Sequence, residues 1–347
     1  MPDIIPNPWR GVGLGLDVKR PSDDVSSVRA LLQNCPAHAP TPLVDAPRIA
    51  EKLGVQTVLI KDERNRMNMG SFKALGAAYV IATEASKAGS ETLNTALKGQ
   101  NFVTASAGNH GLSVAMGARV FGADATIFLA VTVPEAFAER LRELGATVRF
   151  EGDDYEASMK AAASYANQSG ATLLSDSSWR GYIDLPHLLM EGYLQLGAEA
   201  AEAMATPPTH IALQAGVGGF AGAVAAYARH VWGGDPQIIV VEPAAAPALS
   251  ESIKAGKLVD TVGPVSSMGR LDCKTPSLIA LEGLSKDADV FVTLSEEEAQ
   301  GALPLLADIG LETTPSGAAG IAALLAGFPL PSKSIVWAIL TEGPENV

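Results

Sequence analysis

Residues 70–78 read Gly-Ser-Phe-Lys-Ala-Leu-Gly-Ala-Ala, and the small and apolar residues after the lysine predict a helix that packs closely against its neighbours. Ser71 is a candidate N-cap, because serine is among the residues that prefer this position. Lys73 then lies in the first turn of the helix, where the positive end of the helix dipole disfavours a cation. We therefore expect the Lys73 amine to lose its proton more easily than an ordinary lysine.

A neutral amine is what imine formation with an aldehyde requires, and pyridoxal 5'-phosphate is the aldehyde cofactor that uses lysine in this way. The alternative for Lys73 is an ordinary surface lysine on an amphipathic helix, and this stretch alone favours that alternative. Support for a pyridoxal phosphate site must therefore come from other parts of the chain.

The composition indicates a globular α/β protein with two hydrophobic cores. The chain has 347 residues, whereas domains usually hold about 100 to 150. Its formal net charge is −13 and its basic residues are scattered, which argues against nucleic acid as a partner. Residues 1–10 contain no apolar run of the kind found in signal peptides or membrane spans, so we expect a cytoplasmic protein without membrane attachment.

The two cysteines, Cys35 and Cys273, are too few for a disulfide framework. The chain also lacks the Cys-x-x-Cys and His-Glu-x-x-His spacings, so no metal site is indicated. We expect both cysteines to be small buried hydrophobic residues.

Apolar runs alternate with amphipathic stretches along most of the chain. In its middle part, strands are expected at 102–104, 125–130, 147–150 and 172–174, and helices at 111–120, 134–144 and 155–168. Further on, strands are expected at 210–213, 237–241, 290–293 and 335–340, and helices at 188–204, 220–231 and 316–325. This alternation predicts parallel sheets with helices on both faces.

The N-terminal part is expected to be an irregular arm over residues 1–45, with one helix near 25–32. A strand at 57–60 then precedes the Lys73 segment, so the lysine follows a strand end, where sites of α/β proteins lie. Ser295, with Glu298 three residues later, predicts a capping box at a further helix start.

These elements predict an α/β protein of two doubly wound lobes with a cofactor in the cleft between them. The strand at 57–60 precedes the middle unit, so we expect the large lobe to be discontinuous. The predicted large cofactor-binding domain comprises residues 1–80 and 200–347, and the small α/β domain comprises residues 81–199.

A glycine-flanked polar turn, Thr-Ala-Ser-Ala-Gly-Asn-His-Gly, occupies residues 104–111 between an expected strand and an expected helix. Backbone N–H groups at such a helix start can hold a carboxylate, and the Asn109 amide can donate a hydrogen bond to a phenolic oxygen. The alternative is an ordinary strand-to-helix turn.

Residues 214–221, Gln-Ala-Gly-Val-Gly-Gly-Phe-Ala, also follow a strand and open a helix, a construction that binds phosphate. Gly216-x-Gly218-x-x-Ala221 fits the dinucleotide fingerprint as well, with Glu242 about 20 residues further on as a ribose-binding acid. A nicotinamide-dependent oxidoreductase is therefore the rival interpretation. It explains neither Lys73 nor the Asn109 turn, whereas a phosphate cup for a different cofactor explains all three.

Two further polar stretches complete the set. Residues 175–182, Ser-Asp-Ser-Ser-Trp-Arg-Gly-Tyr, contain Asp176 as a candidate general acid/base and Arg180 as a candidate ligand of an anionic substrate group, unless they form a solvated surface loop. Thr341 follows the last strand, and its hydroxyl can reach a ring nitrogen unless this stretch is simply a chain end.

In this order, residues 71–73, 106–111, 216–219 and 341–343 resemble the motifs of the fold type II pyridoxal phosphate enzymes, the tryptophan synthase β-like group. The resemblance covers residues 40–343. It implies that Lys73 binds the cofactor and moves the Cα proton, that Asp176 assists proton transfer, and that a homodimer forms. The implied cofactor-binding residues are Lys73, Asn109, Gly216, Val217, Gly218, Gly219 and Thr341. The implied substrate-binding residues are Ser106, Ala107, Gly108, His110 and Arg180.

Within that group, residues 176–182, 214–218 and 341–343 are similar to the corresponding motifs of the diaminopropionate ammonia-lyases. The implied function is pyridoxal phosphate-dependent β-elimination from a β-substituted L-2-amino acid, such as 2,3-diaminopropionate, to a 2-oxo acid and ammonia. A serine/threonine or 3-hydroxyaspartate dehydratase is the alternative within the same fold. The hydroxyl of Thr341 agrees with elimination, because a neutral partner leaves the pyridine nitrogen unprotonated and disfavours transamination.

Two positions depart from the motifs of those lyases. Ala107 stands where they have an acid before Gly-Asn-His-Gly, and that acid is expected to serve D-enantiomers. L-substrates should therefore be processed here and D-substrates should be poor. Arg180 stands where they have a glutamate, and a guanidinium at the site favours a substrate with an anionic side chain. Alternatively, Arg180 points to solvent or pairs with a nearby carboxylate.

Overall fold

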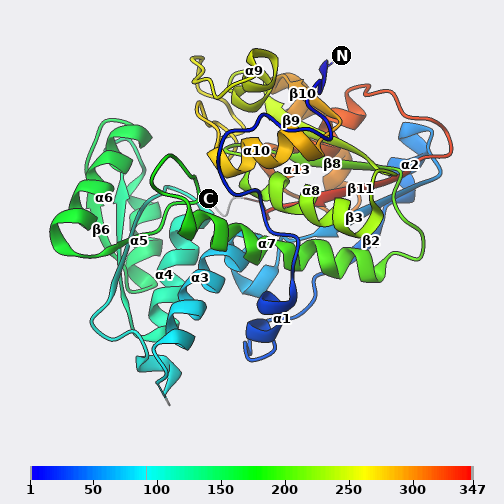
Figure 1. The fold of residues 1–347 in the computed structure, drawn as a ribbon. Coiled ribbons are helices and arrows are strands. Elements are labelled where there is room, and N and C mark those ends of the chain that lie inside the picture. The colour runs from blue at the N-terminus through cyan, green and yellow to red at the C-terminus, as the bar shows by residue number, and fades with distance from the viewer. Residues whose placement is uncertain (1, 91, 345–347) are drawn as a thin grey trace.

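The computed structural model describes residues 2–90 and 92–344. Figure 1 shows two α/β units, each built around its own sheet. The larger sheet has the strand order β1-β10-β9-β8-β11-β3-β2, and the smaller sheet has the order β6-β5-β4-β7. The predicted α/β class with two lobes is confirmed.

The larger sheet is parallel inside and antiparallel at its two edges. Its strands are β1 (Asp3–Pro6), β2 (Leu43–Asp45), β3 (Thr57–Asp62), β8 (His210–Gln214), β9 (Gln237–Pro243), β10 (Val290–Leu294) and β11 (Ile335–Leu340). The inner strands pair in parallel, whereas β1 and β2 pair antiparallel with β10 and β3. Inner strands such as β11 are continuous apolar runs because both of their faces are buried.

Successive residues of these strands enter two separate hydrophobic clusters, because neighbouring side chains point to opposite faces of a sheet. On β9, Ile238 and Val240 lie in one cluster and Ile239 and Val241 in the other. The helices that contribute to the first cluster include α7 (Asp184–Ala203), α8 (Gly219–Trp232), α9 (Ala248–Ala255) and α10 (Leu278–Asp287). Those of the second are α2 (Pro47–Leu53), α11 (Glu296–Gly301), α12 (Leu303–Ala307) and α13 (Pro315–Leu325).

The smaller sheet is parallel throughout. Its strands are β4 (Asn101–Ala105), β5 (Asp124–Leu129), β6 (Thr147–Phe150) and β7 (Thr172–Leu173). The helices around it are α4 (Asn109–Phe121), α5 (Glu135–Glu143) and α6 (Tyr155–Ser169). Helix α3 (Lys73–Lys87) packs against α4 of this unit and against α7, so the helix that begins at Lys73 lies where the two units meet.

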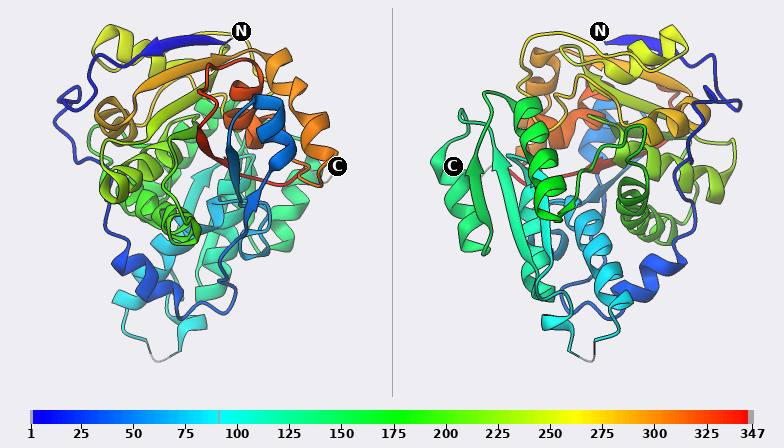
Figure 2. Two further views of the ribbon diagram at one scale, coloured as in Figure 1. Left: turned by 90° about the vertical axis from the view of Figure 1, so that its right-hand side faces the viewer. Right: turned by 60° about the vertical axis from the view of Figure 1, so that its left-hand side comes forward.

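The N-terminal segment runs along the outside of the larger unit from β1 to α1 (Ser26–Leu32), as both views of Figure 2 show. It is held to α10 by hydrogen bonds from the N–H groups of Leu14 and Leu16 to Ser285 and Glu282. The helix predicted near 25–32 is confirmed, but the prediction of an otherwise irregular arm is wrong at both ends, where β1 and β2 form. These strands are only four and three residues long, so they give almost no alternation signal.

The other missed elements are also short. Helices α2, α9, α10 and α12 have between five and ten residues. The 3₁₀ turns η1 (Arg66–Asn68) and η2 (Leu93–Thr95) have three residues each. By contrast, the capping box of Ser295 and Glu298 is confirmed at the start of α11. The domain boundaries at residues 80 and 200 stay a prediction.

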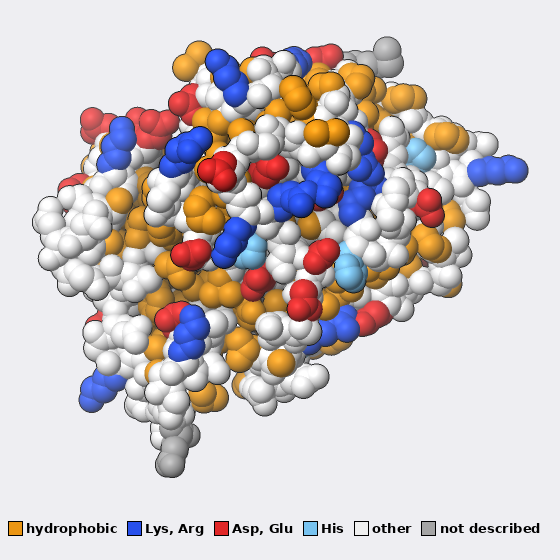
Figure 3. Space-filling model, viewed as in Figure 1, with side chains coloured by type: hydrophobic (Ala, Val, Ile, Leu, Met, Phe, Trp, Pro, Cys, Tyr) orange, Lys and Arg blue, Asp and Glu red, His pale blue; other side chains and the backbone are white. Residues whose placement is uncertain are grey.

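Basic and acidic side chains are interspersed on the face shown in Figure 3.

Within residues 2–90 and 92–344, no helix combines the length and the apolar character needed to cross a membrane.

Candidate active site

Lys73 is the first residue of α3, and its side chain reaches Asp176 in the loop after β7. Nζ lies 2.5 Å from Oδ2 of Asp176, and the two side chains are 20% and 17% exposed. The prediction that Ser71 is the N-cap is wrong, because Ser71 forms a β-bridge with Glu342 and the helix begins only at Lys73. The Ser71 hydroxyl instead accepts the Lys73 N–H at 3.3 Å.

The ion pair decides the charge of the lysine. Burial lowers the pKa of Lys73, but the Asp176 carboxylate and Tyr193 raise it more, so the net pKa lies above that of an ordinary lysine. Burial likewise raises the pKa of Asp176, and the Lys73 ammonium overcompensates, so its net pKa lies below the usual range. The expectation that the helix end makes Lys73 lose its proton easily is therefore wrong while this ion pair is formed.

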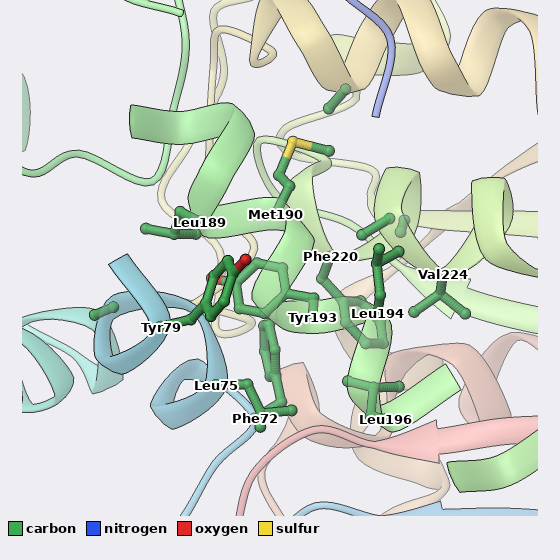
Figure 4. Close-up of a cluster of buried hydrophobic side chains, with 14 of the residues drawn as sticks. Phe72, Leu75, Tyr79, Leu189, Met190, Tyr193, Leu194, Leu196, Phe220 and Val224 are labelled. Carbon is green, nitrogen blue, oxygen red and sulfur yellow. The ribbon is translucent and has the colours of Figure 1, made fainter. Parts of the chain in front are cut away.

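An aromatic cluster surrounds the start of α3 (Figure 4). The Phe72 ring lies 4.9 Å from the Tyr193 ring and 4.7 Å from the Phe220 ring, centroid to centroid. Nζ of Lys73 lies 5.3 Å from the Phe72 centroid. Gly76 permits this packing, since a Cβ there would lie only 2.6 Å from the Tyr193 ring. The cluster fixes α3 against α7 and α8.

His110, the second residue of α4, is buried near this ion pair. Its Nε2 lies 2.8 Å from the Leu174 carbonyl oxygen, which accepts only, so Nε2 carries the proton and Nδ1 is an acceptor. Nδ1 is buried and has no partner within the described residues. Burial lowers the pKa of His110, while the charge of Asp176 raises it and that of Lys73 lowers it, and the net pKa is lowered.

Asn109 begins α4, and its amide donates a hydrogen bond to the carboxylate of Glu342. The Thr314 hydroxyl donates to the other carboxylate oxygen, and Nε of Arg270 lies 3.5 Å from Oε2. A cavity of about 500 Å³ is lined by Asn109, Arg270, Thr314 and Glu342 together with neighbouring polar residues.

The remaining residues of the predicted carboxylate turn lie beside this cavity wall. Ser106 accepts the Gly108 N–H through its hydroxyl at 3.2 Å. Gly108 is buried under the Arg270 side chain, since a Cβ there would lie 3.4 Å from Cδ of Arg270. Ala107 is exposed and carries no proton-transfer group.

The glycine loop, residues 216–219, joins β8 to the N-terminus of α8. Gly218 has φ +95°, and a Cβ there would lie 3.0 Å from Ala280, so glycine is required. The N–H groups of Gly218, Gly219 and Phe220 donate to no other group within the described residues. Free N–H groups at the positive end of a helix form an anion site, and this one adjoins Asp176, whose carbonyl oxygen would lie 3.7 Å from a Cβ at Gly219.

Thr341 follows β11 and is buried. Gln214, the last residue of β8, donates from Nε2 to the Thr341 hydroxyl at 3.2 Å. The hydroxyl therefore accepts on one side, and its own hydrogen is bound by no acceptor in the described part of the chain. The Thr341 carbonyl oxygen accepts the Phe72 N–H at 3.1 Å, so the threonine lies beside the lysine segment.

Arg180 lies away from this group of contacts. It is exposed at the tip of a turn between Trp179 and Tyr182, whose rings stack at 4.4 Å. Its side chain makes no hydrogen bond or ion pair with any described residue. The assignment of Arg180 to substrate binding stays a prediction. The fold does bring together the other predicted groups: Lys73, Asp176, His110, Asn109, Thr341 and the glycine loop.

Three residues of the site were missed. Tyr193 contacts Lys73 from the middle of α7, Glu342 binds Asn109, and Cys273 lies against the glycine loop, 3.0 Å from a Cβ at Gly216. The expectation that both cysteines are buried is wrong, because Cys35 and Cys273 are each only partly buried. Burial and the charge of Asp176 raise the pKa of the Cys273 thiol to about 12. Glu342 lies within the motif at 341–343 but was given no role there, and no local motif marks Tyr193 or Cys273, which only tertiary packing brings to the site.

Glu242 argues against the dinucleotide interpretation of the loop. It is fully buried and accepts hydrogen bonds from the N–H groups of Leu249 and Ser250 at 2.7 and 2.8 Å. Burial raises its pKa to about 7. Its carboxylate therefore caps the first turn of α9, where it is not available to a ribose.

Residues 35–342 match the model of the family described as pyridoxal-phosphate dependent enzyme. The chain belongs to this family. Its cofactor is pyridoxal phosphate, and the residues present fit that group. They provide a lysine amine, an anion-binding loop with free N–H groups, and a hydroxyl with a free hydrogen.

Known relatives of the enzyme agree with this assignment. Diaminopropionate ammonia-lyase of Escherichia coli strain K12 is 31% identical over 92% of this chain and 88% of its own. The crystal structure of that lyase from Escherichia coli with an aminoacrylate-PLP azomethine reaction intermediate has a TM-score of 0.87 and 29% identity, covering 99% of this chain and 94% of the other. The complex with D-serine has a TM-score of 0.88 with 28% identity and the same coverage. Human L-serine dehydratase/L-threonine deaminase is 28% identical over 79% of this chain and 78% of its own.

Proposed function

We propose that this enzyme is an ammonia-lyase that removes the β-substituent of an L-2-amino acid, with 2,3-diaminopropionate as the first candidate substrate. With this substrate the balanced reaction consumes one water and yields pyruvate and two ammonia molecules. The observation that carries the proposal is the contact of 2.5 Å between Lys73 and Asp176 beside the glycine loop. The 31% identity to diaminopropionate ammonia-lyase of Escherichia coli supports the choice of substrate.

Each cofactor contact has a group suited to it. Lys73 would hold the cofactor through its amine, residues 216–219 would bind the phosphate, and Asn109 would donate to the phenolic oxygen. The bound cofactor supplies an electron sink for the negative charge that develops at Cα. Lys73 is the group that takes the proton from Cα, and Asp176 is the carboxylate that holds or passes a proton at Nζ.

The hydroxyl of Thr341 supports elimination. Its hydrogen has no acceptor among the described residues, and it would be donated to a ring nitrogen that carries no proton. An unprotonated ring is a weaker electron sink and disfavours transamination relative to loss of a β-substituent.

The exposed side chain of Ala107 supports a preference for L-substrates. It offers no group that takes a proton from the face opposite Lys73, which is the face that Cα–H of a D-amino acid presents. The lyase from Escherichia coli, in contrast, has been solved with D-serine. We therefore infer slow turnover of D-substrates by this enzyme.

The test is ammonia release from L- and D-2,3-diaminopropionate, L-serine, L-threonine and 3-hydroxyaspartate, with the 2-oxo acid measured in parallel. We expect the highest kcat/KM with L-2,3-diaminopropionate and very low rates with its D-enantiomer. Equal rates with the two enantiomers would overturn the role given to Ala107.

A second candidate function is that of a serine/threonine or 3-hydroxyaspartate dehydratase. The 28% identity to human L-serine dehydratase/L-threonine deaminase supports it. A higher kcat/KM with L-serine or L-threonine than with L-2,3-diaminopropionate would favour this candidate. A preference for 3-hydroxyaspartate that is lost in Arg180→Gln would place Arg180 in substrate binding.

We also propose a cytoplasmic homodimer, with a discontinuous large domain of residues 1–80 and 200–347. The motif resemblance supports the homodimer, and the position of β3, which precedes the smaller unit in the chain but pairs within the larger sheet, supports the discontinuous domain. Light scattering of the purified enzyme measures the oligomeric state, and the mass of a monomer would contradict the proposed homodimer.

A further inference from the structure

Glu342 joins segments that lie far apart in the chain. It follows β11, is 5% exposed, and lies at the N-terminus of α13. Its carboxylate accepts hydrogen bonds from Asn109 of α4 and from Thr314, the N-cap of α13, and Arg270 lies beside it. The negative charge is thus stabilised by a guanidinium and by the positive end of a helix of eleven residues.

The backbone on either side of the same residue holds the lysine segment. Glu342 forms an antiparallel bridge with Ser71. On either side of that bridge, Phe72 donates to the Thr341 carbonyl oxygen at 3.1 Å and Gly343 donates to the Gly70 carbonyl oxygen at 2.9 Å. The segment 341–343 therefore binds the backbone immediately before Lys73, and the side chain of Glu342, in the middle of this segment, binds the amide of Asn109.

The chemistry of the carboxylate determines how Asn109 is oriented. A carboxylate only accepts hydrogen bonds, so the amide must turn its NH₂ group toward Glu342. One N–H of that group is bound to the carboxylate, and the second remains for another acceptor. A glutamine at position 342 can face the amide with either its oxygen or its NH₂, so it does not impose this orientation.

We propose that Glu342 is a positioning residue that orients the Asn109 amide toward the phenolic oxygen of the cofactor and keeps it in register with Lys73. The proposal rests on the assignment of Asn109 to that oxygen. It concerns cofactor binding, which is measured without substrate, so its failure is distinguishable from a wrong choice of substrate.

The first experiment is a double-mutant cycle on cofactor binding. The apoenzymes of wild type, Glu342→Gln, Asn109→Ala and the double variant are titrated with pyridoxal phosphate, and the pH titration of the bound cofactor's absorption is followed. Loss of a hydrogen bond to a charged group should raise Kd about tenfold in Glu342→Gln and shift the absorption midpoint. Because Glu342 acts through Asn109, Glu342→Gln should add almost nothing in the Asn109→Ala background.

Glu242→Gln is the matched control. Glu242 is also a buried glutamate that accepts backbone N–H groups and a serine hydroxyl, but it caps α9 outside the site. It should lower the melting temperature and leave the absorption midpoint unchanged. An equal shift in Glu242→Gln, or full additivity of the Glu342 and Asn109 substitutions, would overturn the proposal.

A second pair of variants tests the contact if Glu342→Gln folds poorly. Asn109→Asp sets two carboxylates against each other and should lower the melting temperature. Adding Glu342→Gln restores a donor and acceptor pair, so it should recover the melting temperature while cofactor affinity stays weak. Absence of this recovery would show that Glu342 does not orient residue 109.

Discussion

Two opposing influences set the pKa of the Asp176 carboxyl group. Burial is the largest influence on it and raises its pKa, whereas the ammonium of Lys73 at 2.5 Å lowers the pKa below the usual range. Whenever Nζ carries no positive charge, burial is no longer opposed by the lysine and the carboxylate binds a proton more readily. Asp176 is thereby suited to hold a proton at Nζ and to release it again.

Asp176→Asn removes this proton acceptor but keeps the shape of the side chain. We expect kcat to fall by about 10² to 10⁴, the usual contribution of a general acid/base, while the absorption band of the lysine-bound cofactor persists. Steady-state kinetics and a visible spectrum measure both effects. Asp153→Asn, at a surface position of the small unit, is the control and should retain normal kcat. A loss below about tenfold would limit Asp176 to a structural role.

Among the elements, the strand-to-helix loops are the parts that the sequence predicts best. The Asn109 turn and the glycine loop are local, since each lies between a strand and a helix whose periodicity is visible in the chain. The loop that contains Asp176 is also recognised from local sequence, but its position in the fold depends on a long-range contact. Ser178 of this loop accepts hydrogen bonds from the N–H groups of Leu278 and Ile279, the first two residues of α10.

Gly218→Ala tests the glycine loop. The added Cβ would lie 3.0 Å from Ala280 and 3.1 Å from Leu249, and φ is +95°. We expect the Kd of pyridoxal phosphate to rise at least about tenfold, because the free N–H groups are displaced. Gly145→Ala is a matched control, since φ there is +89° with nothing within 4 Å of the added Cβ. If both variants bind the cofactor as wild type does, the loop is not the phosphate site.

Tyr193, Glu342 and Cys273 show where sequence reasoning reaches its limit. Tyr193 and Cys273 lie in segments whose local pattern indicates nothing beyond core packing or a loop, Glu342 lies in the motif at 341–343 without a role of its own, and each reaches its partner because distant elements meet there. Tyr193 contacts Lys73 because α7 packs on α3, a contact between residues more than one hundred positions apart. The edge strands β1 and β2 were missed for the opposite reason, because they are too short for a pattern to develop.

In the whole molecule, a buried charge cluster joins the large sheet to α7. Glu199 lies 2.7 Å from Lys61 and 2.7 Å from Arg66, and Arg66 lies 2.7 Å from Glu63. All four side chains are at most 4% exposed. Burial raises the pKa of Glu199, but Arg66 and Lys61 lower it more, to about 2. The cluster fixes the backbone that leads from β3 toward Lys73.

Glu199→Gln leaves two buried cations with one partner and should lower the free energy of unfolding by about 3 to 5 kcal/mol. The pKa of Glu199 is lowered by folding from 4.5 to about 2, so its stabilising contribution is present above pH 4.5 and is lost as the pH falls toward 2. In Glu199→Gln, the free energy of unfolding should therefore fall less than in the wild type as the pH is lowered from 4.5 toward 2. Urea unfolding at several pH values measures it.

Glu202→Gln on the same helix is the control for this prediction. Glu202 pairs with Arg29 but is 63% exposed, so its substitution should cost less than about 1 kcal/mol. Equal effects of the two substitutions would mean that the buried cluster adds no special stability.

The central claim is that Lys73 binds pyridoxal phosphate covalently, and trapping that bond tests it most directly. The purified enzyme is treated with borohydride, which reduces an imine to a stable secondary amine, and its peptides are then analysed by mass spectrometry. We predict the mass of the reduced cofactor on the peptide that contains Lys73, and no label in Lys73→Ala, in which turnover is also lost. Label on a different lysine, or a protein that retains normal activity without Lys73, would contradict the account.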